Sequence, residues 1–153
     1  MPNTYTQLHI QLVFAVKGRE NLLPKSRKEE LHKFITGIAQ KRGNKMLAIN
    51  SMPDHIHIFI GLNPALSISD VVRDIKTNSS IFITEQKIVP RKFSWQEGYG
   101  AFSYSRSHVD AVVQYVLNQE EHHKKQSFKE EYIDFLKKFE IEYNEKFLFD
   151  WIE

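Results

Sequence analysis

The segment MPDHIHIFIGL, residues 52–62, reads as a β-strand that carries two histidines between isoleucines. Successive side chains of a strand point to opposite faces of its sheet. One face therefore receives Ile56, Ile58, Ile60 and Leu62, and the other receives His55, His57, Phe59 and Gly61. The isoleucine face is purely apolar, which predicts contact with a hydrophobic core. The histidine pair needs a second explanation.

The composition indicates a single globular domain. A chain of 153 residues is long enough to bury about two thirds of the surface that its unfolded form exposes. It contains no cysteine, so any metal ion must be held by histidine, carboxylate, amide or water. The N-terminal segment has no basic stretch before a continuous apolar run. We therefore expect a cytoplasmic protein with neither a signal peptide nor a membrane span.

Charge is distributed unevenly along the chain. Residues 1–128 hold 17 basic and 11 acidic side chains, a net charge of +6, whereas residues 129–153 hold 4 and 8, a net charge of −4. A basic body fits a polyanionic partner such as nucleic acid, and it fits an ordinary solvated surface equally well. We expect residues 1–128 to form the domain and residues 129–153 to form a helical extension docked on it.

Four segments have the apolar spacing of amphipathic helices. The first three are predicted to begin at capping residues followed three positions later by an acid: Ser26 with Glu29, Ser67 with Asp70, and Ser107 with Asp110. The first runs to Gly43. The predicted buried stripe of the third is Val109, Val112, Val113, Val116 and Leu117. The fourth helix, residues 127–143, is followed by an aromatic tail, NEKFLFDWIE.

Strands are predicted at residues 8–16, 44–50, 55–62 and, after a glycine turn, within 92–105. The order β, α, β, β, α, β, α with a C-terminal extension predicts an α+β fold of the ferredoxin-like split βαβ type. This is an antiparallel sheet with helices on one face, here with an added C-terminal helix and tail. The isoleucines would meet the helices, and the histidines would lie on the open face.

Two imidazoles at positions i and i+2 of one strand face lie about 6.5 Å apart at their Cβ atoms. Both rings can then bind one divalent ion at about 2.0 to 2.1 Å. Two histidines alone do not complete a metal site. The same pair is also compatible with ordinary surface residues on an exposed sheet that bind no metal. Further ligands would have to come from another part of the fold.

The segment QYVLNQEEHH offers candidates for the rest of such a site. At about 100° per residue, Tyr115 and Gln119 lie on one helical stripe with Ala111 and His122, at the flank of the valine face. A helix at the margin of the sheet would direct this stripe toward the histidines. The spacing leaves open that Tyr115 is an ordinary boundary aromatic and Gln119 a solvated polar residue.

Three motifs, PDHIHIFIGL, WQEGYGAFSYS and YVLNQEEHHKKQSFKEEY, occur here in an order and spacing that resemble one family. This is the single-tyrosine transposases of the HUH class, named for histidine, a bulky hydrophobe and histidine, which include the REP-associated tyrosine transposases. Its members move insertion sequences as single-stranded DNA. The resemblance extends from VKGR after the first strand to FEIEYNEKFLFDW near the C-terminus.

The resemblance implies specific roles. His55 and His57 would bind a divalent metal ion, Mg²⁺ or Mn²⁺, with the amide oxygen of Gln119 as third protein ligand. Tyr115 would be the nucleophile that cleaves one strand of hairpin-ended DNA, leaving a 5′-phosphotyrosine and a free 3′-OH. The family also implies a homodimer whose active sites are shared between subunits.

DNA contacts are expected from basic and aromatic side chains. The basic candidates are Lys17 and Arg19 after the first strand, and Arg73 and Lys76 on the second predicted helix. Tyr99, Phe102 and Tyr104 are candidates for stacking on unpaired bases. Each basic residue has the alternative of being an ordinary solvated charge.

Two other functions fit parts of the sequence. GYGAFSY resembles the glycine and aromatic signature of a non-catalytic RNA-recognition sheet, although Glu97 and Ala101 depart from that pattern. Such a module would leave the histidine pair unexplained. The second alternative is a host-adopted relative that uses the same strand-transfer chemistry on genomic repeats.

Overall fold

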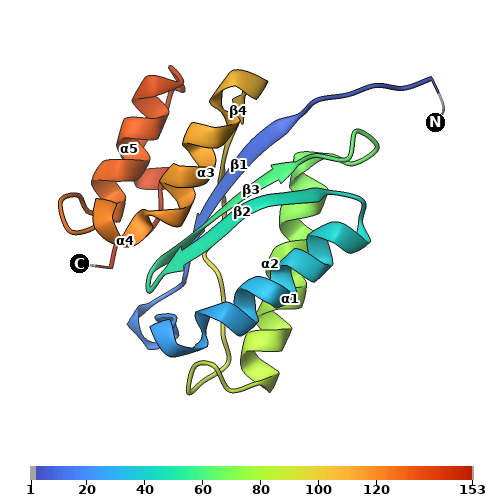
Figure 1. Ribbon diagram of the computed structural model, residues 1–153. Helices are drawn as coiled ribbons and strands as arrows, with labels where there is room; N and C mark the ends of the chain where they lie inside the picture. The colour runs from blue at the N-terminus through green and yellow to red at the C-terminus, as the bar shows by residue number, and fades with distance from the viewer. Residues whose placement is uncertain (1–2, 153) are drawn as a thin grey trace.

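The computed structural model describes residues 3–152, and its centre is a four-stranded sheet in the order β2-β3-β1-β4 (Figure 1). Every pairing in the sheet is antiparallel. The strands are β1 His9–Ala15, β2 Lys45–Met52, β3 His55–Gly61 and β4 Gly100–Tyr104. The helices are α1 Lys28–Lys41, α2 Ile68–Glu85, α3 Val109–Leu117, α4 Gln119–His122 and α5 Phe128–Lys138. This strand order with two crossover helices confirms the ferredoxin-like α+β fold.

The isoleucine face of β3 packs against α1 and α2, as predicted. Ile56 and Ile58 are fully buried in a core that includes Ile35 of α1 and Ile75 of α2. The two helices contact each other through Phe34 and Phe82, whose rings stack at 4.0 Å between centroids. The apolar periodicity of the three segments therefore determines this layer.

The other face of the sheet is not open, and the prediction of an exposed histidine face is wrong. α3 and α5 cover it (Figure 1), and His55 and His57 have no exposed surface. Phe59 of β3 packs with the buried valines of α3, and Phe102 of β4 stacks on Phe135 of α5 at 4.9 Å. Both helices have apolar faces that must be removed from water, and the second sheet face is the surface that receives them.

Of the three predicted helix caps, only the one at Ser67 forms, and α5 has a cap that the sequence analysis did not predict. Ser67 accepts from the backbone N–H of Asp70 at the start of α2, and Ser127 forms a full capping box at the start of α5. Ser26 and Ser107 cap no helix, because each lies in a 3₁₀ turn, Lys25–Arg27 or Arg106–His108, that precedes α1 or α3. The 3₁₀ turns shift the start of both helices by one residue, to the N-cap positions Arg27 and His108.

The predicted third helix is divided at Asn118. Asn50 of β2 donates from its amide to the carbonyl oxygens of Val116 and Leu117, at 3.0 and 3.2 Å, and so satisfies the last carbonyls of α3. The helix ends there and α4 begins at Gln119. Leu117, the last residue of α3, is 51% exposed and is not part of the buried stripe as predicted.

The C-terminal segment packs on α5 and on the loop before β4. Phe149 is buried against Tyr132 and Phe128. The side chain of Gln96 exchanges two hydrogen bonds with the backbone of Asp150, each 2.7 Å long. No helix within residues 3–152 combines the length and apolar character needed to cross a bilayer.

Candidate functional site

His55 and His57 lie on β3, beneath the helices that cover the second sheet face. Their ring centroids are 5.1 Å apart. The Nδ1 atom of His55 donates to Oδ1 of Asp54 over 2.7 Å, and Nδ1 of His57 lies 2.9 Å from the side-chain amide nitrogen of Gln11 on β1. Each ring is thus held by one nitrogen, and its other nitrogen, Nε2, points toward α5.

A carboxylate from α5 meets both imidazoles. Glu131 is only 2% exposed. Its Oε1 accepts from Nε2 of His57 at 3.1 Å and from Nε2 of His123 at 3.2 Å, and it lies 3.5 Å from Nε2 of His55. One ligand atom from each of these four residues lies within 4.8 Å of the others. We call His55, His57, His123 and Glu131 the histidine–glutamate cluster; imidazole and carboxylate are side chains that hold divalent metal ions.

Gln119 enters the same region at the start of α4 and is fully buried. Its Oε1 accepts from Nε2 of His123 at 2.9 Å and lies 3.4 Å from Nε2 of His55. Its amide nitrogen donates to Oε2 of Glu131 over 3.1 Å. The structure therefore brings Gln119 to the histidine pair, with its amide oxygen beside two imidazoles.

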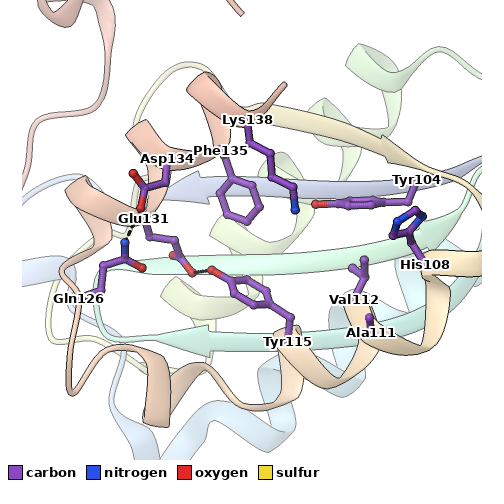
Figure 2. Close-up of a pocket in the computed structure, with 10 residues that line it drawn as sticks. All are labelled: Tyr104, His108, Ala111, Val112, Tyr115, Gln126, Glu131, Asp134, Phe135 and Lys138. Atoms are coloured by element: carbon purple, nitrogen blue, oxygen red, sulfur yellow. Dashed lines mark hydrogen bonds between the residues drawn. The ribbon is translucent and has the colours of Figure 1, made fainter. Parts of the chain in front are cut away.

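Tyr115 on α3 reaches the cluster through Glu131. Its hydroxyl donates to Oε2 of Glu131, as Figure 2 shows. The ring lies edge-on to His57, with centroids 6.0 Å apart, and stacks on His122 at 4.5 Å. All four residues of the predicted site, from three different elements, thus meet within one chain.

Burial and charge set the protonation of the cluster. Burial alone would raise the pKa of Glu131, but the surrounding imidazoles outweigh it and hold the pKa well below its usual value. Burial lowers the pKa of His57; for His55 the opposing effects of Asp54 and Glu131 are stronger than burial and raise the pKa. Glu131 is therefore ionised, and His55 is more readily protonated than His57.

The same carboxylate acts on Tyr115. Burial, followed by the negative charge of Glu131 and the hydrogen bond to it, raises the pKa of Tyr115 far above the usual phenol value. Tyr115 is consequently held as a phenol, which is a weak nucleophile without further activation.

Two cavities are lined in part by residues of the cluster. The smaller, about 370 Å³, lies between α3 and α5 and is lined by Tyr115, Glu131, Tyr104 and Lys138 among others (Figure 2). The larger, about 660 Å³, is lined by His123, Asp54, Arg19 and Lys129 among others. Gln126 lines both cavities. One cavity therefore reaches Tyr115 and Glu131, and the other reaches His123.

The four predicted basic DNA contacts fall on two sides of the molecule. Lys17 and Arg19 follow β1 and are exposed, and Arg19 lines the larger cavity. Arg73 and Lys76 lie on α2, across the sheet from the cluster (Figure 1). Arg73 is paired with Asp70 at 2.7 Å, while Lys76 donates to two backbone carbonyls of the loop before β4, at 2.8 and 2.6 Å. The structure does not bring this second pair to the histidines.

The predicted stacking role of Phe102 is wrong. Its side chain is 2% exposed beneath Phe135 and Phe139 of the C-terminal segment. Tyr104 is half-buried and donates to Oε1 of Gln11 over 3.1 Å, and Tyr99 is 37% exposed. An RNA-recognition sheet needs its aromatic face free for bases; here α3 and α5 cover that face.

Sequence reasoning missed Glu131 and gave His123 no role. A signal for Glu131 was present, because it lies three residues after Phe128 and four before Phe135, inside the apolar stripe of its helix. A carboxylate at such a position must be paired when buried. His123 follows Gln119 by four residues, one helical turn, and so shares its side of the chain.

Most of the chain matches a known protein family. Residues 4–119 match the family model described as transposase IS200 like. The ISDra2 transposase TnpA of Deinococcus radiodurans is 24% identical over 118 residues, which are 74% of this chain and 84% of that protein. The match to the family model ends at Gln119, so His123 and Glu131 lie beyond it.

Two solved structures share the fold. A putative transposase from Deinococcus radiodurans R1 superposes with a TM-score of 0.60 at 24% identity, covering 76% of this chain and 94% of that one. A REP-associated tyrosine transposase bound to a REP hairpin superposes with a TM-score of 0.58 at 17% identity, covering 79% and 72%.

Proposed function

Because the chain belongs to the family of IS200-like transposases, we propose that it cleaves and rejoins single-stranded DNA through a covalent phosphotyrosine at Tyr115. The observation that carries this proposal is the shared carboxylate of Glu131, on which the hydroxyl of Tyr115 and Nε2 of His57 meet. A tyrosine that served only in packing would not need its hydroxyl at a cluster of imidazoles.

The proposed ligands of a divalent ion are His55, His57 and the amide oxygen of Gln119. Their donor atoms fit such an ion, since the imidazole nitrogens point into one space and the amide oxygen lies 3.4 Å from one of them. When bound, the ion polarises the scissile phosphate and stabilises the leaving oxygen. Mg²⁺ and Mn²⁺ are the ions that the family resemblance implies.

In the proposed reaction the phenol oxygen of Tyr115 attacks the phosphorus of one phosphodiester. The bond from phosphorus to the 3′-oxygen breaks, the phenol loses its proton, and the departing 3′-oxygen gains one. The products are a 5′-phosphotyrosine and a free 3′-OH. One ester replaces another, so the reverse attack by a 3′-OH rejoins DNA without ATP.

The proposed substrate is single-stranded DNA with hairpin ends. A hairpin is bound in the structure of the REP-associated transposase that shares this fold. The two cavities beside Tyr115 and His123 provide space for the nucleotides on either side of the scissile phosphate. Arg19 and Lys129, in the larger cavity, supply positive charge for phosphates. A host-adopted enzyme would use the same site, and hairpins flanking the gene would distinguish a mobile element.

The active site is proposed to form within one chain. The family resemblance implies a homodimer whose subunits share their sites, but here Tyr115 contacts Glu131 of its own chain. A dimer of this protein would then join two complete sites. Mixing two inactive variants distinguishes a complete site in each chain from a site formed by residues of two chains.

A covalent-adduct experiment tests the proposal. The purified protein is incubated with Mn²⁺ and a labelled hairpin oligonucleotide with single-stranded flanks, then separated on a denaturing gel. Wild type should give an SDS-resistant protein–DNA adduct, Tyr115→Phe should give none, and Tyr143→Phe, a tyrosine in the C-terminal segment, should behave as wild type. An adduct with Tyr115→Phe would refute the nucleophile assignment; its absence from wild type with every ion and hairpin tested would refute the cleavage function.

A further inference from the structure

The C-terminal helix brings a charged group into the metal site, and the family match stops short of it. We propose that Glu131 and His123 are protein ligands of the divalent ion, in addition to the histidine pair, so that the segment after residue 119 completes the metal centre. This inference rests on the proposed function, because it concerns the same ion.

The distances suit direct coordination by Oε1 of Glu131. Ligand atoms around an ion with bonds of about 2.1 Å lie about 3 Å apart when adjacent and about 4.2 Å apart when opposite. Oε1 lies 3.1, 3.2 and 3.5 Å from Nε2 of His57, His123 and His55. These are distances between adjacent ligands. The limit of 4.8 Å among all four ligand atoms requires only a small contraction to close the site.

The burial of the Glu131 carboxyl group also favours a cation at this site. The carboxyl group of Glu131 has almost no exposed surface. It accepts hydrogen bonds from imidazoles, from the amide of Gln119 and from the phenol of Tyr115, and none of these groups is a permanent cation. A buried carboxylate is costly unless it is paired or coordinates a metal. A divalent ion between Oε1 and the imidazoles would give this carboxylate a permanent cation as its partner.

The side chains that contact the Nδ1 atoms of His55 and His57 are of the kind that orient histidine ligands in metal sites. A histidine ligand usually donates its second ring N–H to a carboxylate, a carbonyl or water. His55 already donates from Nδ1 to Asp54. At His57 a half-turn of the Gln11 amide presents its oxygen to Nδ1, and the amide nitrogen can then donate to the hydroxyl of Tyr104. Both Nε2 atoms become free to bind an ion.

The enlarged donor set has two consequences. Three imidazoles and one carboxylate favour Mn²⁺ or Zn²⁺ over Mg²⁺, which prefers oxygen ligands and retains its waters. The second oxygen of Glu131, Oε2, accepts from Tyr115 and Gln119. Glu131 therefore connects the ion to the proposed nucleophile, and ion binding should fix α5 against β3.

Calorimetric titration of the whole protein with Mn²⁺ tests the inference without DNA. We expect Glu131→Gln to weaken Mn²⁺ binding by at least about tenfold. Asp134→Asn removes a carboxylate one turn further along α5, outside the cluster, and should leave the affinity within about twofold. Mg²⁺ should bind the wild type at least about tenfold more weakly than Mn²⁺.

X-ray absorption of the Mn²⁺-loaded wild type gives a second measurement that no folding defect can confound. Three imidazoles in the first coordination shell support the inference, and two overturn the role of His123. Unchanged Mn²⁺ affinity in Glu131→Gln overturns the role of Glu131 and leaves the proposed function intact, provided that His57→Ala abolishes binding. If the wild type binds no ion at all, both this inference and the metal dependence of the proposed function fail.

Discussion

The hydroxyl of Tyr115 donates a hydrogen bond to Glu131, a residue that follows it by 16 positions and lies on a different helix. The other oxygen of the same carboxylate accepts from His57 on the central sheet. α3 and α5 pack side by side over the histidine strand (Figure 1), and this packing makes the contact possible. One carboxylate thus joins the proposed nucleophile to the histidine pair inside a single chain.

The ionisation of Tyr115 should depend on Glu131. Burial and the Glu131 carboxylate both raise the pKa of Tyr115, so wild-type Tyr115 should remain a phenol at pH values where an ordinary tyrosine ionises. In Glu131→Gln the pKa should fall but stay above 10.0, because burial remains. Ultraviolet titration of each protein against its Tyr115→Phe counterpart isolates this one phenol. Identical titrations in the two backgrounds would contradict the coupling.

The ionisation of Glu131 should make the free energy of unfolding depend on pH. Its pKa is lower in the folded protein than the ordinary value of 4.5, so its contribution is complete above that pH and is lost as the pH falls below it. Without added metal, Glu131→Gln should lower the free energy of unfolding by about 3 kcal/mol at neutral pH. The difference in unfolding free energy between wild type and Glu131→Gln should decrease by about 1.4 kcal/mol per pH unit below 4.5. Urea denaturation of both proteins from pH 7 downward measures this difference. A difference that does not change with pH would show that the charge of Glu131 does not cause the loss of stability.

Subunit mixing should fail to restore activity. If each chain holds a complete site, then Tyr115→Phe and His57→Ala remain inactive when they are coexpressed and purified together. In a shared site, one half of a mixed dimer would combine an intact tyrosine with an intact histidine pair. The labelled-hairpin adduct assay reads the result, with coexpressed wild type and His57→Ala as the positive control. Recovery of the adduct when Tyr115→Phe and His57→Ala are coexpressed would establish that the active site is shared between subunits.

The two helix starts at Ser127 and Ser26 should differ in their sensitivity to substitution. Ser127 accepts from the backbone N–H of Glu130 at 3.2 Å, so Ser127→Ala should cost about 1 kcal/mol of unfolding free energy. Ser26 caps no helix, and Ser26→Ala should change stability by less than about 0.5 kcal/mol. Chemical denaturation of both variants makes the comparison. Equal losses would mean that the 3₁₀ turn before α1 is not the structure in solution.

Much of the fold could be predicted because its signals are local. The alternation of residues 52–62, the cap at Ser67 and the break at Gly43, whose φ is 81°, each follow from a few neighbouring residues. The predicted starts of α1 and α3 were wrong by one residue, since a serine followed by an acid also fits a 3₁₀ turn. The carbonyl oxygen of Leu117 at the end of α3 is satisfied by Asn50, which is 67 positions away, and no local pattern contains that contact.

The site divides in the same way. The sequence by itself determined that His55 and His57 share one face of a strand and that Tyr115 and Gln119 lie one helical turn apart, because backbone geometry sets these relations. Only the tertiary structure decided that the histidine face is buried and that Glu131 lies at its centre. The physical reason is that α3 and α5 each have an apolar stripe with no partner within its own segment. Packing both stripes on the second sheet face brings a carboxylate from the end of the chain to imidazoles in its middle.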